Sequence, residues 1–507
     1  MKSILCFFVF ISFSITKLHC QTPENFTDHL MAFVSNKNFD EALNLIDSVL
    51  QVDPQNADVM VFRGYVKSQA GDFKGALIEF DRAIAIDSSI SFAFIFRAYT
   101  KQILDDFDGA MKDYNTAAEL EPDSYLVYFN RGTLHFHNKK YEEAKMDFSL
   151  AIERNPDDPT YYLMRGESEM LLEEFEDAIF DFNNCLELDP DNMEAHYFRG
   201  ITFEQLEKHY EAYEDLSTCI YLNPDHTEVA LWAANILINA GDFQGGLEDL
   251  NKFKNKFPEY QEDELYVSLL SEAKEGILKL KENLDKDSNV LLDAMTYLEL
   301  AVKKIGVKDD LSALEDLNRA VALNTELVDA WRRRGLVKFN LGYYHGSIAD
   351  LSKSLDMQPN DVDALIVRGY ALGFIREYAA AVSDYSAVLS IDPTDTMALR
   401  NRGLCKFEME DYQGALEDFN VLVNISPDNA DSYRYRAMVK TNFNDNEGAL
   451  ADLNKSMAIN PDDPLIYFYR SNVFFNLQQP DKACQDLEVA IKGRIMSAQK
   501  IYDFKCK

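Results

Sequence analysis

The first candidates for binding a metal ion or transferring a proton are two histidines, His135 and His137. They are separated by one residue in a stretch expected to be helical, so their side chains point to different faces and make a poor metal pair. Adjacent acids such as Asp157 and Asp158 stand at expected helix starts, where capping accounts for them. No phosphate loop, nucleophile elbow or zinc-protease motif is present. We therefore expect no enzyme activity, no cofactor and no metal site.

A regular series of arginines, each followed by an acid sixteen residues later, is the other charged pattern. The pairs are Arg63 and Glu79, Arg97 and Asp113, Arg131 and Asp147, Arg165 and Asp181, Arg199 and Asp215, Arg334 and Asp350, Arg368 and Asp384, Arg402 and Asp418, Arg436 and Asp452, and Arg470 and Asp486. On two paired antiparallel helices, such residues can form a bidentate pair across the helix interface. Repetition favours a structural role, and an arginine free to grip an acidic ligand is the alternative.

The elements that would position these pairs repeat every 34 residues. A proline marks the end of most units, at Pro54, Pro122, Pro156, Pro190, Pro224, Pro258, Pro359, Pro393, Pro427 and Pro461, and Ser88 and Thr325 stand at the same place in two others. Each unit also has a small residue in its first helix, as at Gly132 and Gly166, and an alanine in its second, as at Ala144 and Ala178. A period of this length predicts an array of helical pairs that stack on their neighbours.

The small residue, the alanine, the aromatic residue four positions later and the terminal proline, at this period, resemble the tetratricopeptide repeat family. The match covers nearly all of the chain beyond residue 20. The resemblance implies an all-α fold, a right-handed superhelical solenoid of stacked helix-turn-helix repeats. It also implies that the first helices line a concave groove that binds peptides or proteins.

The repeats divide the chain into two predicted arrays. Residues 1–20 form a signal peptide, residues 21–260 a first array of about seven repeats and residues 294–497 a second array of about six. Between them, residues 261–293 lose the register, which predicts a degenerate helical pair that continues the stack, with a flexible linker as the alternative. Residues 498–507 are expected to be the end of a capping helix.

In the first array, the residues expected to line the groove are unusually apolar. They are Phe62, Tyr65, Phe96, Tyr99, Phe129, Phe136, Met164, Tyr197, Phe198 and Trp232. Such a surface could receive an extended or helical apolar segment of another protein. The alternative for each aromatic residue is that it packs between neighbouring helices.

In the second array, the equivalent positions carry positive charge. They include Arg332, Arg333, Arg400 and Arg434, accompanied by Asn401 and Tyr435. These residues could recruit an acidic peptide or a chain terminus through charge-assisted hydrogen bonds, or the arginines could pair with acids of the next repeat. The family's cytosolic carboxylate clamp is not matched, since the residues around Asn130 and Asn401 differ from the clamp pattern.

The formal net charge of the 507-residue chain is -36, and it becomes -38 when a signal peptide containing Lys2 and Lys17 is removed. A chain this acidic repels nucleic acid and anionic lipid. We therefore expect protein or peptide partners, and no nucleic acid.

The N-terminus has the features of a secretory signal. An apolar run from Ile4 to Ile15 follows Lys2, and a possible cleavage point lies after Cys20. The run is too short to span a bilayer, and no later stretch is apolar enough to do so, so no membrane span is expected after cleavage. We expect export to the periplasm or secretion, with lipidation of Cys20 in an outer-membrane lipoprotein as a minor alternative.

Five cysteines remain beyond residue 20, an odd and sparse set that does not indicate a disulfide framework. Cys185 and Cys219 hold the same place in adjacent repeats, about one helix packing distance apart, and are expected to be core residues.

Together, these features predict an exported, non-catalytic scaffold that binds peptide or protein segments through its groove. A chaperone-like carrier that shields apolar segments in the cell envelope is the alternative. An uncharacterised enzyme is the third and least favoured function.

Overall fold

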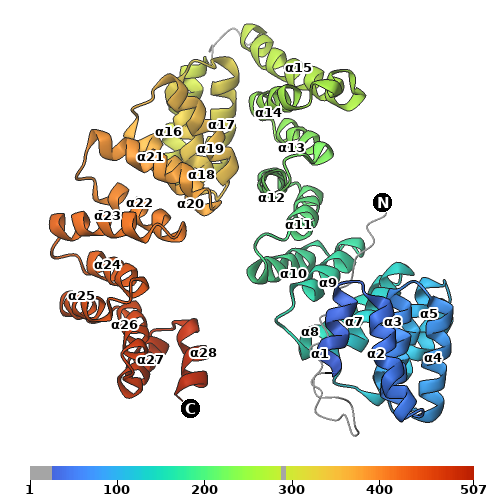
Figure 1. The fold of residues 1–507 in the computed structure, drawn as a ribbon. Coiled ribbons are helices and arrows are strands. Elements are labelled where there is room, and N and C mark those ends of the chain that lie inside the picture. Colours follow the sequence, from blue (N-terminus) through green and yellow to red (C-terminus); the bar gives the residue numbers. More distant parts are fainter. Residues whose placement is uncertain (1–25, 287–292, 507) are drawn as a thin grey trace. The chain divides into compact units, whose positions relative to one another are not determined.

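The computed structural model describes residues 26–286 and 293–506. Within these ranges the protein is all-helical, with helices that follow one another in hairpin pairs and no β-strand (Figure 1). The expected signal peptide, residues 1–20, lies outside the described residues. The chain divides into two compact units, unit 1 up to Thr202 and unit 2 from Phe203. This division lies within the first predicted array rather than in the segment 261–293.

Unit 1 contains five helical pairs. Their helices are α1 (Phe26–Ser35), α2 (Phe39–Val52), α3 (Ala57–Gln69), α4 (Phe73–Ile86), α5 (Ser91–Ile103), α6 (Phe107–Leu120), α7 (Tyr125–His137), α8 (Tyr141–Arg154), α9 (Pro159–Leu171) and α10 (Phe175–Leu188). The division between the units falls within α11 (Met193–Gln205). Each odd-numbered helix is the first helix of its repeat, as the 34-residue period predicts.

Unit 2 begins with α12 (His209–Leu222), α13 (Thr227–Asn239), α14 (Phe243–Lys256), the 3-10 helix η1 (Pro258–Glu262) and α15 (Glu264–Lys286). It continues with α16 (Ala294–Gly306), α17 (Asp310–Leu323), α18 (Val328–Asn340), α19 (Tyr344–Met357), α20 (Val362–Phe374) and α21 (Tyr378–Ile391). The last helices are α22 (Thr396–Glu408), α23 (Tyr412–Ile425), α24 (Ala430–Asn442), α25 (Asn446–Ile459), α26 (Pro464–Asn476), α27 (Pro480–Lys492) and α28 (Met496–Lys505).

The small residue of each first helix is required because an aromatic or aliphatic side chain of the second helix lies against it. A Cβ atom added to Gly132 would lie 2.9 Å from Phe148, and one added to Gly403 would lie 2.6 Å from Phe419. The alanines of the second helices, such as Ala144, have no exposed surface. Close approach of the paired helices therefore follows from side-chain size at these positions.

The arginine–acid pairs form as predicted, and they also join successive repeats. Eight arginines donate two hydrogen bonds each to their acid: Arg97, Arg131, Arg165, Arg334, Arg368, Arg402, Arg436 and Arg470. Each also donates through Nη1 to a side chain sixteen residues earlier, in the preceding second helix, as Arg131 does to Asn115. Arg63 departs from the pattern, with its Nε 3.7 Å from Glu79. The structural interpretation of the series is confirmed for these eight arginines.

A lysine often supplies a second cation to the same acid, twelve residues before it. Lys101 lies 2.7 Å from Asp113, and Lys440 lies 2.8 Å from Asp452. In the repeat of α9 and α10 this position is occupied by Glu169, which is buried and whose Oε2 has no hydrogen-bond partner. Burial, together with the nearby Asp181, raises the pKa of Glu169 to about 8.

The described part of the segment 261–293 differs from the expected helical pair. It forms one continuous helix, α15, after the short helix η1, and residues 287–292 lie outside the described range. Tyr266, Leu269 and Ala273 of α15 are buried against α13 and α14 through Leu231 and Phe253. The helix α15 therefore covers the end of the first group of repeats in unit 2.

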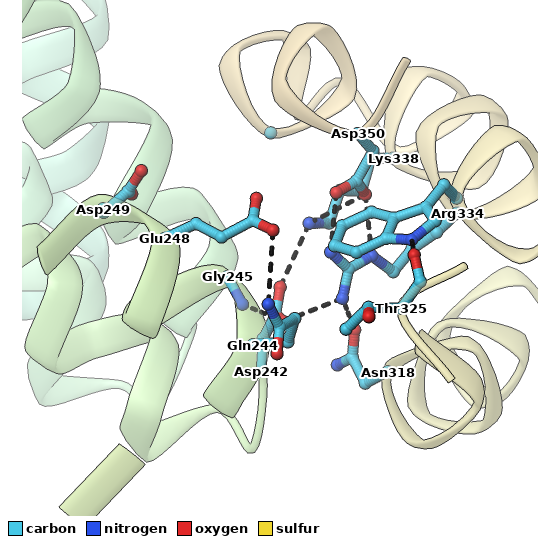
Figure 2. A network of polar contacts seen from close by, with 12 residues as sticks. Asp242, Gln244, Gly245, Glu248, Asp249, Asn318, Thr325, Arg334, Lys338 and Asp350 are labelled. Carbon is cyan, nitrogen blue, oxygen red and sulfur yellow. Dashed lines mark hydrogen bonds and ion pairs between the residues drawn. The ribbon is translucent and has the colours of Figure 1, made fainter. Parts of the chain in front are cut away.

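Unit 2 also contains contacts between repeats that are far apart in the sequence. Asp242, which accepts a hydrogen bond from the Gly245 N–H at the start of α14, lies 2.8 Å from Arg334 and 3.2 Å from Lys338, both on α18. Figure 2 shows the Asp242 carboxylate facing these two side chains and Asp350 beside them. All four residues are buried. Although burial opposes ionisation, the charges of Arg334 and Lys338 lower the pKa of Asp242 to about 2.

Two further contacts hold α12 against the same helices. The Glu214 carboxylate accepts hydrogen bonds from the backbone N–H groups of His345 and Gly346, at 2.8 and 2.9 Å, and so binds the start of α19. The Tyr210 ring stacks on Tyr343, with centroids 5.2 Å apart. This region includes Asp249 and Asp316, which hold the acid position of their repeats but have Ala233 and Leu300 in place of the arginine sixteen residues earlier. Asp249 accepts from the Tyr213 hydroxyl and Asp316 pairs with Lys304 instead.

The last helix, α28, packs on α27 through a cluster that includes Leu487 and Ala498. A disulfide joins Cys484 of α27 to Cys506 at the end of α28. The cysteine count did not indicate this bond, since a single pair among five cysteines has no recognisable spacing. Cys185 and Cys219 are buried, as expected for core residues, and Cys405 is buried as well.

Candidate binding surfaces

A hollow in unit 1 lies over the first helices α3, α5 and α7. Its wall consists of Tyr65, Ser68, Gln69, Phe80, Phe92, Ile95, Phe96, Tyr99, Leu126 and Asn130. The Phe96 ring lies between its neighbours, with its centroid 5.2 Å from that of Tyr65 and 6.1 Å from that of Phe92. Three of the predicted groove residues, Tyr65, Phe96 and Tyr99, are therefore brought together. We call the face of the first helices that carries these positions the inner face.

Two predicted groove residues are instead part of the core. Phe62 is 5% exposed and contacts the Phe26 ring edge-on, and Phe129 is 4% exposed and packs on Phe148 and Tyr161. The alternative of packing between helices holds for both. Hydrophobic periodicity indicates the face of a helix that a side chain occupies, but it does not give the depth to which a neighbouring helix covers it.

The remaining predicted groove residues of the first array lie outside the hollow. Phe136 and Met164 are partly buried beside the core cluster of α7 and α8. The Phe198 ring stacks on Phe182, and Tyr197 contacts Phe198 edge-on. Trp232 lies on α13 in unit 2 and is partly buried.

The prediction omitted several wall residues, among them Phe92, Leu126 and Asn130. Phe92 and Leu126 are 34 residues apart and therefore hold the same position in adjacent repeats. In the repeat of α5, this position lies three residues before Ile95. Extending the 34-residue register to this position would have found them. Asn130 donates a hydrogen bond from Nδ2 to the Leu126 carbonyl oxygen at 2.7 Å.

One row of positions on the inner face of unit 1 changes from aromatic to acidic along the repeats. The row that begins with Tyr65 and Tyr99 continues with Thr133 and Glu167. Burial, followed by repulsion from Glu194, raises the pKa of Glu167 to about 7. No lysine or arginine of the described residues forms an ion pair with Glu167.

The arginine row of unit 2 is largely neutralised from within. Arg332 contacts Asp329 on its own helix and lies 3.7 Å from both Asp361 and Asp363. Arg333 also pairs with Asp329, at 2.7 Å.

Arg434 is neutralised in the same way, since it pairs with Asp431 and lies 3.5 Å from Asp463. Its guanidinium also lies over the Tyr435 ring, which in turn stacks on Phe419. The alternative of pairing with acids of the next repeat is therefore correct for Arg332 and Arg434, whereas Arg333 pairs with an acid of its own helix.

Arg400 differs from the other three. It donates to the Tyr370 hydroxyl at 3.1 Å and to Asn401 Oδ1 at 3.3 Å, and forms no ion pair within the described residues. Asn401 is 8% exposed, and its Nδ2 has no acceptor. Because an arginine Nε can only donate, the asparagine must present its oxygen to Arg400.

Residues 26–286 and 293–506 contain no group of three or more His, Cys, Asp or Glu side chains arranged to hold a metal ion. Over the same ranges, no helix is both long and apolar enough to cross a membrane.

Comparisons with known proteins agree with this architecture. Family models described as tetratricopeptide repeat match residues 27–89, 125–158, 159–192, 194–226 and 366–430. Searching the curated proteins gave no match to the chain.

Several solved structures are similar to parts or most of the chain. YrrB, a TPR protein with an unusual peptide-binding site, is 20% identical over 36% of this chain and 95% of its own, with a TM-score of 0.33. The PilF protein of Pseudomonas aeruginosa is 18% identical over 41% of this chain and 96% of its own, with a TM-score of 0.38. A chain of the APC/C hetero-tetramer Cut9-Hcn1 is 14% identical over 94% of this chain and 95% of its own, with a TM-score of 0.35.

Proposed function

Since the chain belongs to the tetratricopeptide repeat family, whose members act as scaffolds for peptides and proteins, we propose that it is an exported, non-catalytic scaffold. In this proposal, the inner face of unit 1 binds a segment of a partner protein. The observation that carries the proposal is the hollow over α3, α5 and α7, whose wall is mainly aromatic and aliphatic.

The composition of the hollow favours an apolar side chain of the partner. Tyr65, Phe92, Phe96 and Tyr99 offer large ring surfaces, and burial of an apolar side chain against them contributes roughly 25 cal/mol per Å² of area removed from water. Asn130 Oδ1, beside the bond that its Nδ2 makes to Leu126, is an acceptor for a backbone N–H of the bound segment. A peptide that places one apolar residue in the hollow fits both features.

Export is proposed on two grounds. The first is the signal-like sequence from Met1 to Cys20. The second is the Cys484–Cys506 disulfide, since such bonds persist in oxidising compartments and are rare in the cytosol. We place the mature protein in the periplasm or outside the cell, with an outer-membrane lipoprotein attached through Cys20 as the alternative.

Peptide selection followed by a binding measurement tests the scaffold. Peptides selected from a random library on the immobilised protein are labelled, and their affinity is measured by fluorescence anisotropy for the wild type and for a Phe92→Ser, Tyr99→Ser double variant. We expect the double variant to bind at least tenfold more weakly, because two rings of the hollow are lost. The matched control is Phe180→Ala, which removes an aromatic ring that is 63% exposed on the second helix α10.

Equal affinity of the wild type and the double variant would contradict binding in the hollow. Uniformly weak binding of many unrelated unfolded chains, without a selected motif, would favour the carrier function instead. Hydrogen exchange of α3 and α5 in the double variant shows whether the unit is still folded.

The N-terminal mass of the protein purified from its native cells tests export. A chain that begins at Gln21 supports cleavage of a signal peptide, and a lipid adduct on Cys20 supports the lipoprotein alternative. A chain that retains Met1 to Cys20, with Cys484 and Cys506 reactive towards maleimide without prior reduction, would contradict export.

A further inference from the structure

The arginines at one inner-face position of unit 2 can be compared residue by residue, because the repeat register aligns them. Arg332, Arg400 and Arg434 hold the same position in their repeats. Arg400 comes two repeats after Arg332 and one repeat before Arg434. At Arg332 and Arg434, two carboxylates neutralise the arginine. The first stands three residues before the arginine and the second stands 29 residues after it. They are Asp329 and Asp361 for Arg332, and Asp431 and Asp463 for Arg434.

Both of these carboxylates are missing at Arg400. The residue three positions earlier is Met397, and the residue 29 positions later is Asn429. Asn429 is already engaged, since its Oδ1 caps α24 by accepting from the backbone N–H groups of Asp431 and Ser432. Asp431 itself pairs with Arg434. The chain therefore keeps the arginine at this position and lacks both acids that neutralise it elsewhere.

Two donor groups, the Arg400 guanidinium and the Tyr370 hydroxyl, remain for a ligand at this point. The Arg400 guanidinium donates from Nη2 to the Tyr370 oxygen, and within the described residues its Nη1 has no acceptor. The Tyr370 hydroxyl accepts that bond, so its own hydrogen stays available for a second acceptor. The neighbouring Asn401 Nδ2 is buried without a partner, a further sign that the polar groups here are not satisfied by the fold alone.

We infer that Arg400 and Tyr370 form a binding site for a single carboxylate group carried by a partner peptide. The guanidinium supplies the charge and a planar pair of N–H donors, and the tyrosine hydroxyl supplies a third donor. The carboxylate of the peptide takes the place of the aspartates that pair with Arg332 and Arg434 within the chain. This site lies in unit 2 and does not depend on the hollow of unit 1.

The test restores the missing internal partner instead of removing the arginine. Met397→Asp places a carboxylate three residues before Arg400, as Asp329 and Asp431 stand before Arg332 and Arg434. Met397 is 44% exposed and lies in the first turn of α22, where an acid is favoured, so the variant should fold. A ligand carboxylate must then compete with the introduced carboxylate for the guanidinium, a competition that is absent in the wild type.

The probes are three capped tripeptides, titrated at constant ionic strength into the full chain labelled with 15N-arginine. Ac-Ala-Glu-Ala-NH2 carries a side-chain carboxylate, Ac-Ala-Ala-Ala-OH carries a terminal one, and Ac-Ala-Gln-Ala-NH2 carries none. The Nε–Hε resonance of Arg400, assigned by its loss in Arg400→Gln, is the readout. We expect a saturable shift with one or both carboxylate peptides, no such shift with the Gln peptide, and an affinity about tenfold weaker in Met397→Asp.

The matched control is Arg333→Gln, which removes an arginine already paired with Asp329 and should leave the titration unchanged. The relative affinities of the first two peptides distinguish an acidic side chain from a chain terminus. The inference is overturned by a shift that does not saturate, by an equal response to the Gln peptide, or by equal affinity in Met397→Asp. Thermal unfolding of each variant establishes that its fold is intact.

Discussion

In unit 1 the inner face carries aromatic rings over α3 and α5 and carboxylates further along the array, whereas in unit 2 it carries four arginines, of which three are paired within the chain. The residues that hold the helices together are the same in both units: Arg131 and Arg402 make the same bidentate bonds to their acids. Since these positions maintain the fold, the inner-face positions are free to differ, and their chemistry does differ between the two units.

The comparison also shows that equivalent residues differ in burial. Arg97 of unit 1 has a side chain that is 16% exposed, whereas Arg334 of unit 2 is fully buried and contacts Asp242 in addition to Asp350. The contact between Arg334 and Asp242 exists because α14 packs against α17 in unit 2, which brings Asp242 at the start of α14 to Arg334 on α18. Arg334 thus carries a larger energetic weight than Arg97, whereas Arg402 and Arg436 of unit 2 are about as exposed as Arg97.

The largest expected effect comes from this difference. Arg334→Met leaves Asp242 and Asp350 buried with only Lys338 as counter-charge, and should lower the free energy of opening of α18 by about 3–5 kcal/mol. Arg97→Met should cost α5 roughly 1–3 kcal/mol, because water can still reach the site. Native-state hydrogen exchange of α18 and α5 measures both values, and equal losses would contradict the distinction between Arg334 and Arg97.

A second prediction concerns the positions that the two units share. Gly132→Val in unit 1 and Gly403→Val in unit 2 each force a side chain against an aromatic ring, Phe148 or Phe419. Overpacking of this kind costs about 1–3 kcal/mol, and we expect similar losses in both units. Hydrogen exchange of α7 and α22 tests this expectation. A loss confined to one unit would show that the shared positions do not have the same structural role.

A third prediction uses the pH dependence of unit 1. Since the pKa of Glu169 is raised to about 8 in the folded protein, from an ordinary 4.5, the folded state binds more protons than the unfolded state between these values. The stability of the α9–α10 pair should therefore fall as the pH rises from about 4.5 to 8.

Glu169→Lys places at this position the cation that Lys101 provides in an earlier repeat, and it should raise the free energy of opening of α9 and α10 at pH 8 by about 1–2 kcal/mol. Glu169→Gln, which stays neutral, should remove the pH dependence without adding an ion pair. Hydrogen exchange between pH 5 and pH 8, corrected for the intrinsic exchange rate, measures the effect. An unchanged pH dependence in both variants would refute it.

The smallest expected effect is that of Arg333→Gln. Arg333 pairs with an aspartate of its own helix, its side chain is 32% exposed, and such pairs contribute about 0.3–0.5 kcal/mol. Urea unfolding followed by circular dichroism should therefore show almost no change. A loss above about 1 kcal/mol would mean that Arg333 makes a contact beyond its helix.

The sequence predicted the repeated part of the fold well, because each helical pair is built from contacts within 34 residues. The small residue, the alanine and the arginine–acid pair recur at fixed spacings, and their partners in the same repeat follow from helix geometry. For the candidate sites the prediction was partial. Tyr65, Phe96 and Tyr99 line the hollow, whereas Phe62 and Phe129 are buried, because periodicity fixes a helix face and not the depth of cover.

The sequence alone therefore determined the repeat and the pairing of eight arginines with the acid sixteen residues later, such as Arg131 with Asp147. Only the tertiary structure decided that Asp242 meets Arg334, 92 residues away, and that Cys484 is bonded to Cys506. It also showed that Arg400, unlike Arg332, forms no ion pair within residues 26–286 and 293–506. Local contacts repeat with the sequence period, so a pattern can reveal them. Contacts between distant repeats depend on the path of the chain in three dimensions, which no periodic pattern encodes.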